Sequence, residues 1–363
     1  MTGLDSAVQA LGVAVAARVP VVLWGAPGTG KTSALQAMAS GADWPCEVVI
    51  ASIREPSDFA GLPIVVDGDV RFAPPLWARR LAEAGRGLLF LDELSTAPPA
   101  VQAALLRVVL ERVVGDLALP DEVVVVAAAN PPEQAADGWD LSPPLANRFC
   151  HLDWEVRPSA FAEGLVAGFP VPQIARLPVG WERELPRANA LVSAFATVRP
   201  MLVCAPPTDR AAAGRGWPSP RTWEMAARLW CAADAIGADD ECRSALVRGV
   251  VGDGAGVEFL AWVSQMDLPD PEAVLADPAS FTLPERGDRA YAALSSVAAA
   301  VAAEPTPDRW VAGWKVMAKA GELAPDVAAV AARVLARCRP PGVSPPAELR
   351  AFLPLLRDAG MLE

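Results

Sequence analysis

The sequence has few lysines, a single histidine and no closely spaced cysteines. Its 363 residues include three lysines, at positions 31, 315 and 319, and the histidine is His151. None of the six cysteines forms a Cys-x-x-Cys pair. Because structural zinc sites need clustered cysteine and histidine ligands, this composition argues against such a site. We expect buried, reduced thiols and a structural role for His151, which lies in an apolar run.

Clustered positive charge and long apolar runs are also missing. The formal net charge is −12 at neutral pH, whereas binding along a nucleic-acid backbone needs grouped lysine and arginine. Nucleic acid is therefore not expected as a partner. No secretory signal is visible, and charges or prolines interrupt each apolar run before the ~18 residues of a membrane span. We expect a cytoplasmic protein without a membrane partner.

Apolar segments alternate with helical patterns over the first part of the chain. We expect strands at 19–24, 46–52, 87–93, 122–130 and 150–154. The third of these is apolar almost throughout, so we expect helices to cover it on both faces. Strands that alternate with helices favour a parallel α/β sheet.

Two turn signals interrupt this alternation. Asp67-Gly68 lies between β-prone runs in the segment 64–72, and Gly115-Asp116 lies in a similar setting in the segment 112–120. A Gly-containing pair between such runs is typical of a tight hairpin. We therefore predict two small hairpins inserted into the α/β core.

Strand signals fade after about residue 156, and the remainder is rich in alanine. We expect helices near 187–197, 220–236, 240–250, 288–303, 308–320, 325–338 and 347–359. The proline-rich segment 338–346 is expected to be a stiff connector. The predicted domains are an α/β domain at 1–156, a helical domain at 157–275 and a helical extension at 276–363.

A phosphate-binding loop follows the first expected strand. The segment from Gly25 to Thr32 fits the pattern Gly-x-x-x-x-Gly-Lys-Thr, in which loop N–H groups and the next helix bind phosphates. Lys31 is expected to reach the β- and γ-phosphates, and the Thr32 hydroxyl to ligate Mg²⁺. The expected nucleotide-binding residues are Gly25, Ala26, Pro27, Gly28, Thr29, Gly30, Lys31, Thr32 and Ser33.

Two adjacent carboxylates end the third expected strand. Ligands of such folds bind at the carboxyl ends of the strands, where Asp92 is expected to hold Mg²⁺ through water. Glu93 is placed to orient and deprotonate an attacking water. Because another strand lies between the loop strand and this one in sequence, the pair favours the phosphate-loop ATPases with an added central strand.

Three more polar residues follow in order. Asn130 ends the fourth expected strand, where it could hydrogen-bond the γ-phosphate or the attacking water. Arg148 could act across a subunit interface as an arginine finger. Arg221 stands at a helix start that Ser219 can cap and Pro220 suits, and could sense the γ-phosphate and couple it to domain closure.

These features, in this order and spacing, resemble an AAA+ ATPase, and the finer match is to the MoxR branch. The matching segments are REPSDFAGLPI (54–64), FLDELSTAPPAVQAALLRVVLER (90–112), AAANPPE (127–133) and SPRT (219–222). Both hairpins fall where that branch carries its helix-2 insert and its pre-sensor-1 insert. The resemblance covers about residues 5–235 of this chain. The sequence is also similar to a related group of proteins that reactivates Rubisco.

The resemblance implies functions for the five features. They correspond to Walker A (Gly25–Thr32), Walker B (Asp92 and Glu93), sensor 1 (Asn130), the arginine finger (Arg148) and sensor 2 (Arg221), the last in a helical lid domain. It further implies a hexameric ring with ATP and Mg²⁺ at the subunit interfaces, and chaperone action on a protein client. Such proteins often have a partner with a von Willebrand factor A domain. One departure is the segment LANRF, since relatives often carry an acidic residue before the arginine.

The expected mechanism couples hydrolysis to motion. Glu93 activates water, Asn130 positions it, and loss of the γ-phosphate releases Arg221 so that the lid and hairpins move. Ser52, near the end of the second strand, is expected to hold Glu93 inactive until the client binds.

Three other functions stay open. The first is a binding switch or scaffold in which ATP assembles the ring and turnover is incidental. The second is a DNA-directed AAA+ protein, which the net charge of −12 disfavours. The third is a small-molecule kinase, which explains neither Arg221 nor the hairpins.

Overall fold

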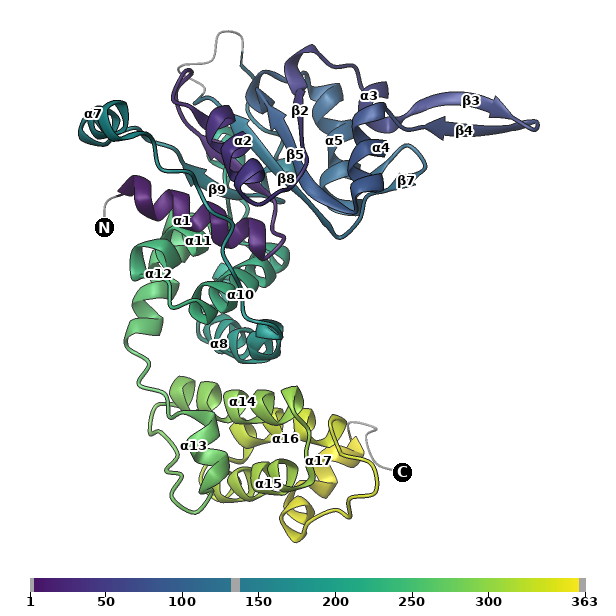
Figure 1. The fold of residues 1–363 in the computed structure, drawn as a ribbon. Helices are drawn as coiled ribbons and strands as arrows, with labels where there is room; N and C mark the ends of the chain where they lie inside the picture. Colours follow the sequence, from purple (N-terminus) through teal and green to yellow (C-terminus); the bar gives the residue numbers. More distant parts are fainter. Residues whose placement is uncertain (1–2, 132–137, 359–363) are drawn as a thin grey trace. The chain divides into compact units, whose positions relative to one another are not determined.

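The computed structural model describes residues 3–131 and 138–358, and these divide into two compact units (Figure 1). The first unit comprises Met1–Pro178 and Cys204–Val257, and the second comprises Val179–Val203 and Glu258–Glu363. The predicted segments 1–156, 157–275 and 276–363 do not coincide with these units. The reason is that the region between residues 157 and 275 contributes helices to both.

A five-stranded parallel sheet forms the centre of the first unit. Its strands are β1 (Val21–Trp24), β2 (Cys46–Ile50), β5 (Arg86–Asp92), β8 (Glu122–Ala129) and β9 (Cys150–Asp153). They lie in the order β2-β5-β8-β1-β9, and each neighbouring pair is parallel. The predicted parallel α/β fold is confirmed, and strands β5 and β8 do lie between the loop strand β1 and the second strand β2.

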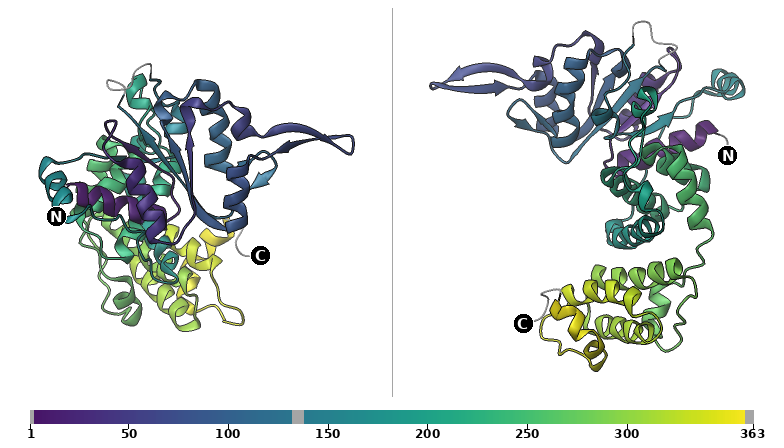
Figure 2. Two further views of the ribbon diagram at one scale, coloured as in Figure 1. Left: turned by 45° about the horizontal axis from the view of Figure 1, so that its top comes forward. Right: turned by 180° about the vertical axis from the view of Figure 1, so that it is seen from behind.

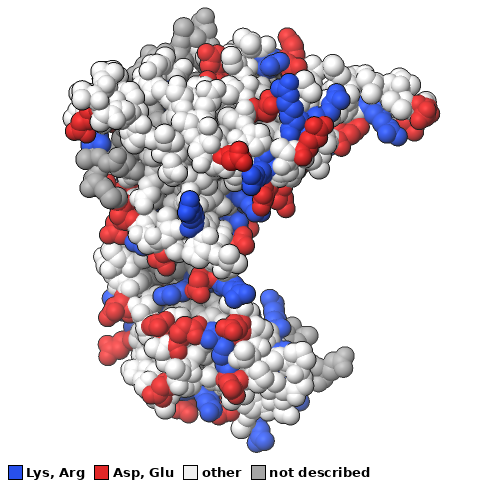
Figure 3. Space-filling view, viewed as in Figure 1, with Lys and Arg blue, Asp and Glu red and all other residues white. Residues whose placement is uncertain are grey.

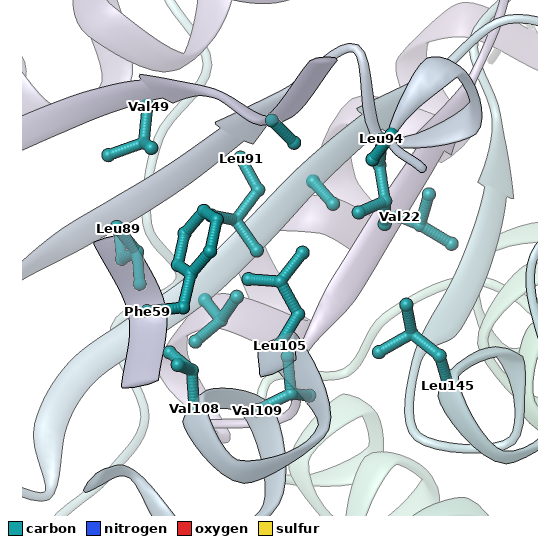
Figure 4. Close-up of a cluster of buried hydrophobic side chains, with 14 of the residues drawn as sticks. Val22, Val49, Phe59, Leu89, Leu91, Leu94, Leu105, Val108, Val109 and Leu145 are labelled. Atoms are coloured by element: carbon teal, nitrogen blue, oxygen red, sulfur yellow. The ribbon is translucent and has the colours of Figure 1, made fainter. Parts of the chain in front are cut away.

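Helices cover the sheet and complete its core. They are α1 (Gly3–Ala16), α2 (Lys31–Gly41), α3 (Ser57–Ala60), α4 (Leu76–Ala84) and α5 (Pro99–Glu111). Figure 4 shows Leu105, Val108 and Val109 of α5 beside Leu89 and Leu91 of β5, with Phe59 among them. All six side chains are at least 95% buried. Burial at roughly 1.5–3 kcal/mol for each large apolar side chain fixes β5, and with it Asp92, against α5.

The structure contains both expected hairpins. The first consists of β3 (Leu62–Val66) and β4 (Asp69–Ala73), and the second of β6 (Val113–Val114) and β7 (Leu117–Ala118). Asp67 and Gly68 both have positive φ, of 53° and 89°, as a type I′ turn requires. The β3–β4 hairpin projects from the sheet in every view (Figures 1 and 2).

The rest of the first unit is helical. It contains α6 (Pro143–Ala146), α7 (Pro158–Ala167), α9 (Arg210–Ala213), α10 (Pro220–Ala235) and α11 (Asp240–Val251). Helix α11 contacts both α1 and β9, and α10 contacts α11 and α1. Part of the expected lid therefore packs directly on the sheet layer. Helix α12 (Asp253–Ser264) continues the chain into the second unit.

The second unit is all helical and has its own core. Its helices are α8 (Leu185–Val198), α13 (Pro271–Ala276), α14 (Gly287–Ala303), α15 (Pro307–Gly321), α16 (Pro325–Arg337) and α17 (Leu353–Asp358), with a 3₁₀ turn at Ala347–Phe352. The fully buried Trp310 and Trp314 pack with Leu335 and Phe352. Helix α8 packs extensively on α14, which is why 179–203 joins the C-terminal region.

The described helices give no membrane-spanning candidate. None of those in residues 3–131 and 138–358 is both long and apolar enough to cross a bilayer.

Candidate functional site

The phosphate-binding loop lies between β1 and α2, at the carboxyl end of the sheet. Gly28 and Gly30 have φ of 75° and 83°, a conformation that glycine adopts without strain. Gly25 donates its N–H to the Ala129 carbonyl at 3.2 Å. A Cβ at Gly25 would lie 2.4 Å from the Trp154 carbonyl oxygen, so glycine is required there. Gly28 and Gly30 are thus needed for positive φ, and Gly25 for the close approach of the Trp154 backbone.

Lys31 is held inside this loop. Its side chain is buried, and its Nζ donates to the carbonyls of Gly25 and Ala26 at 2.7 and 3.0 Å. Nζ also donates to Asn130 Oδ1 at 3.3 Å. Burial lowers the pKa of Lys31 from its ordinary value, while the negative charge of Asp92 opposes that shift. Lys31 is therefore already hydrogen-bonded to Asn130, at the end of β8, where phosphates would bind.

Thr32 and Asp92 meet next to the lysine. Thr32 Oγ1 donates a hydrogen bond to Asp92 Oδ2 at 2.9 Å. A hydroxyl beside a carboxylate suits Mg²⁺, which prefers oxygen ligands and keeps several waters or phosphates as its remaining ligands. Within the described residues no group of three or more acidic, histidine or cysteine side chains could hold a metal ion. The pair fits Mg²⁺ that arrives with a nucleotide, and not a cation held by protein ligands alone.

Glu93 sits beside this pair in a strained backbone conformation. Its φ is 56°, which costs a non-glycine residue about 1–2 kcal/mol. Its N–H donates to Asp92 Oδ1 at 2.9 Å, and its carbonyl accepts from Thr96 Oγ1 at 2.9 Å. Ser52 Oγ donates a hydrogen bond to Glu93 Oε2. The contact that the sequence suggested between Ser52 and Glu93 is therefore present, and the carboxylate is exposed.

Asn130 lies at the end of β8, as predicted. Its side chain accepts from Lys31, and its backbone N–H donates to Ser95 Oγ at 3.0 Å. Ser95 is almost fully buried, and the sequence alone gave no reason to select it. The rest of the segment AAANPPE, residues 132 and 133, lies outside the described residues.

Arg148 lies at the other end of the sheet. It immediately precedes Phe149 and β9, whose first residue, Cys150, pairs with Val21 at the start of β1. Its Nη1 donates to the Pro144 carbonyl, and its buried Nε has no hydrogen-bond partner among the described residues. Burial lowers its pKa most, and the charge of Arg221 lowers it further. The structure does not bring Arg148 to the phosphate loop of its own chain.

Arg221 lies near Arg148, at the start of α10. Ser219 caps that helix as expected: its Oγ accepts from the Thr222 N–H, and Thr222 Oγ1 accepts from the Ser219 N–H. Arg221 is exposed, and no hydrogen bond among the described residues joins it to the phosphate loop. The five predicted features thus form two groups, with Lys31, Thr32, Asp92, Glu93 and Asn130 in one and the two arginines in the other.

A cavity that the sequence did not reveal opens beside β9. It has a volume of about 400 Å³ and is lined by residues of α1, β9 and α11, by the segment 215–216 and by Gly252 and Asp253 at the start of α12. Arg215 on its wall lies 3.9 Å from the centre of the Trp24 ring and pairs with Asp153 at 3.1 Å. His151 accepts from Trp24 Nε1 at 2.9 Å and contacts the Ala146 carbonyl through Nε2, also at 2.9 Å. Burial lowers the pKa of His151 to about 4, which keeps the ring neutral.

Part of the chain is similar to known proteins. Residues 20–149 match the family model of the AAA domain, dynein-related subfamily. Protein MoxR of Methylorubrum extorquens is 34% identical over 114 residues, which are 31% of this chain and 33% of that protein. The chain thus spans about a third of the length of this curated relative.

Two solved structures are also similar, at a lower level. A crystal structure from Cytophaga hutchinsonii, described as a candidate ATPase, is 18% identical, with a TM-score of 0.44 over 69% of this chain and 82% of that one. A full-length MCM homologue from Methanopyrus kandleri is 19% identical, with a TM-score of 0.40 over 72% of this chain and 56% of that one.

The family match begins just before β1 and ends just before β9, so it contains the phosphate loop, both hairpins and Arg148. The sheet order and the loop agree with the family match, so residues 20–149 fold as an AAA domain, and 114 residues of the chain are similar to protein MoxR.

Proposed function

We propose that this protein hydrolyses ATP with Mg²⁺ in an oligomeric ring and uses the energy to remodel or assemble a protein client. The observation that carries the proposal is the separation of the site into two groups at opposite ends of one sheet. The carboxyl end holds the phosphate loop, and the amino end holds two arginines. Because neither group is complete alone, the proposal places each active site between two subunits.

Each residue at the carboxyl end has a separate proposed role at the phosphates. Lys31 would exchange its loop carbonyls for phosphate oxygens. Thr32 and Asp92 would hold Mg²⁺, which when bound neutralises phosphate charge. Glu93 would accept a proton from the attacking water as its oxygen bonds to the γ-phosphorus and the bond to ADP breaks. Asn130, already bonded to Lys31, would orient that water or the γ-phosphate.

The sheet geometry supports action of Arg148 on a neighbour. Asp153 pairs with Trp24, directly before the phosphate loop, and Arg148 lies five residues before Asp153. Strand β9 itself, Cys150–Asp153, spans roughly 10 Å at about 3.3 Å per residue, and Arg148 lies in the turn before it. Among the described residues the Arg148 side chain hydrogen-bonds to the Pro144 carbonyl and not to the phosphate loop. In a head-to-tail ring the amino end of one subunit can face the loop of the next.

The projecting hairpin supports contact with a protein client. One face of β3–β4 carries Pro63 with Phe72 and Val65 with Val70 as cross-strand pairs. Val65 and Val70 are 75% and 62% exposed, although a two-stranded hairpin gains little stability by itself. On the face shown in Figure 3, positive and negative side chains are interspersed and form no basic stripe, which agrees better with a protein than with a nucleic-acid client.

The proposed setting follows the MoxR resemblance. It is a hexameric ring in the cytoplasm, with a partner that bears a von Willebrand factor A domain. A pull-down from cells with the full-length Glu93→Gln protein and ATP would test this. Enrichment of such a partner or of one client protein is expected, and equal recovery with ATP and ADP would contradict nucleotide-dependent binding.

One contact favours a second candidate, a binding switch in which turnover is incidental. Glu93 is bonded to Ser52, so in this conformation the proposed base is partly occupied. If turnover stays slow whether or not a client is present, and partner binding still depends on ATP, the switch is the better description.

ATP turnover separates these proposals. We expect Glu93→Gln to lower kcat by ~10²–10⁴-fold, which is the usual contribution of a positioned general base. Arg148→Ala should lower kcat by ~10³-fold or more, as for arginine fingers. The affinity for ATP should change little in either variant. Glu83→Gln and Arg176→Ala, at exposed positions of the first unit, are matched controls. Wild-type kcat in Glu93→Gln or in Arg148→Ala would contradict the assigned role.

A further inference from the structure

Asn147 joins two chain segments that lie far apart in sequence. The side chain is 3% exposed. Its Nδ2 donates to the Trp217 carbonyl at 2.9 Å, and its Oδ1 accepts from Ser219 Oγ at 2.7 Å. A single amide thus connects the residue before Arg148 with the segment that begins α10.

The hydrogen bonds around this amide form a closed set. The Trp217 carbonyl accepts from Asn147 Nδ2 and from Thr222 Oγ1, the latter at 2.9 Å. Ser219 Oγ donates to Asn147 and accepts from the Thr222 N–H at 3.2 Å. Ser219 and Thr222 are both buried. Because unsatisfied buried polar groups are costly, each member of such a set restrains the others.

The chemistry of position 147 requires an amide. A backbone carbonyl can only accept hydrogen bonds, so the group facing Trp217 must donate. Aspartate has nearly the same shape, but it would place an oxygen against the Trp217 oxygen and lose that bond. The asparagine in LANRF therefore has a physical reason in this chain.

The same set of bonds restrains the backbone that carries the two arginines. Arg148 follows Asn147 directly, and Arg221 lies between Ser219 and Thr222. Two guanidinium groups near the amino terminus of a 16-residue helix repel each other and the helix dipole. The buried Nε of Arg148 is also unpaired among the described residues. A pair held together against repulsion, with a free donor, is suited to an anion such as a terminal phosphate.

We propose that Asn147 is a positioning residue that holds Arg148 and Arg221 as one unit, which acts on the terminal phosphate of ATP bound by the neighbouring subunit. This inference rests on the proposed ATPase function. It adds that the lid residue Arg221 acts across the interface together with Arg148, and that the amide at 147 sets their spacing.

The test uses the full-length protein and its Asn147→Asp variant. Because misplacement of a catalytic group by about 1 Å can cost 10²-fold, kcat should fall ~10–100-fold. The KM and the Kd of a fluorescent ATP analogue should stay within about twofold, since Asn147 is remote from the phosphate loop. Asn189→Asp, the same change at an exposed position, should leave kcat unchanged.

Mixed rings distinguish positioning from general damage. Asn147→Asp subunits have an intact loop, and Lys31→Met subunits have intact arginines. Mixed one to one, they should recover about a quarter of wild-type turnover. In a random mixture, half of the interfaces have an intact loop, and half of those face intact arginines. No recovery, under conditions in which Arg148→Ala with Lys31→Met does recover, would show that Asn147 is only structural and overturn the inference.

Two further outcomes keep the inference separate from the proposed function. Wild-type kcat in Asn147→Asp, with Arg148→Ala inactive, would overturn the inference and leave the ATPase proposal intact. Wild-type kcat in Glu93→Gln and Arg148→Ala would overturn the proposed function itself. If Asn147→Asp does not fold, Ser219→Ala is the second variant, which removes the bond to Oδ1, the helix cap and the contact with Thr222 Oγ1. It should lower kcat ~10-fold and be rescued in the same mixture. Unchanged kcat would overturn the inference.

Discussion

The two ends of the central sheet are assembled in different ways. At the carboxyl end, Asp92 ends β5 and Asn130 follows the neighbouring strand β8, and the loop after β1 places Thr32 and Lys31 within hydrogen-bonding distance of them. At the amino end, Asn147 meets Trp217 and Ser219 through a contact 70 or more residues apart in sequence. The comparison shows that a parallel sheet provides one half of the site directly, whereas the other half depends on how the later helices dock.

The largest effect is expected at the carboxyl end. Lys31→Met keeps the length of the side chain but removes the charge that would contact the phosphates. We expect ~100-fold weaker ATP binding, as for the loss of hydrogen bonds to a charged group, and ~10³-fold lower turnover. Binding can be followed by titration of a fluorescent ATP analogue.

Lys315→Met, at an exposed position of the second unit, is the control for the loss of a lysine. ATP binding by Lys31→Met within twofold of wild type would contradict the placement of phosphates at the loop.

Arg221→Ala tests whether the amino end works as a unit. We expect kcat to fall ~10²–10³-fold, with an unchanged Kd for ATP, because Arg221 lies near Arg148 and not at the loop of its own chain. Turnover of the variant should recover when it is mixed with Lys31→Met. If Arg221→Ala instead weakens ATP binding and is not rescued, Arg221 acts within its own subunit, as lid closure would require.

His151 lies between the two ends and makes stability depend on pH. Burial lowers its pKa to about 4, below the value near 6.5 of an unfolded histidine. Stability from this group is therefore complete above about pH 6.5 and is lost as the pH falls towards about 4. The change is about 3 kcal/mol in the free energy of unfolding.

Urea unfolding at several pH values measures this effect. His151→Gln should be less stable than wild type at pH 7, and the difference should shrink towards pH 4. A difference that stays constant with pH would show that the bonds to Trp24 and Ala146 do not require neutral His151.

The smallest effect is expected at Ser52. Removal of its hydrogen bond in Ser52→Ala frees Glu93, so basal turnover should rise by up to ~5-fold, which corresponds to one hydrogen bond of about 1 kcal/mol. Ser40→Ala, exposed at the end of α2, is the control. Turnover that falls in Ser52→Ala would instead mean that Ser52 helps to orient Glu93 for catalysis.

The sequence was sufficient where the signal is local. Apolar runs predicted the strands, the Asp67-Gly68 turn predicted a hairpin, and the residues around Pro220 predicted the start and cap of α10. Each of these depends on residues within a few positions of each other. The phosphate loop belongs to the same class, since its glycines and lysine are contiguous.

The sequence was insufficient where residues meet only after folding. Ser95 was not among the predicted site residues, yet it accepts a hydrogen bond from the Asn130 N–H. Arg215 stacks on Trp24 from nearly 200 positions away. Helix α8 packs extensively on α14, which lies far later in the chain. Such contacts depend on burial and docking, for which a single sequence has no local pattern.

The most direct test of a site shared between subunits is a one-to-one mixture of Arg148→Ala and Lys31→Met proteins. Each variant alone should be nearly inactive, whereas the mixture should recover about a quarter of wild-type ATP turnover, because half of the subunits offer a loop and half offer arginines. A mixture no more active than the sum of its two inactive components would contradict the account.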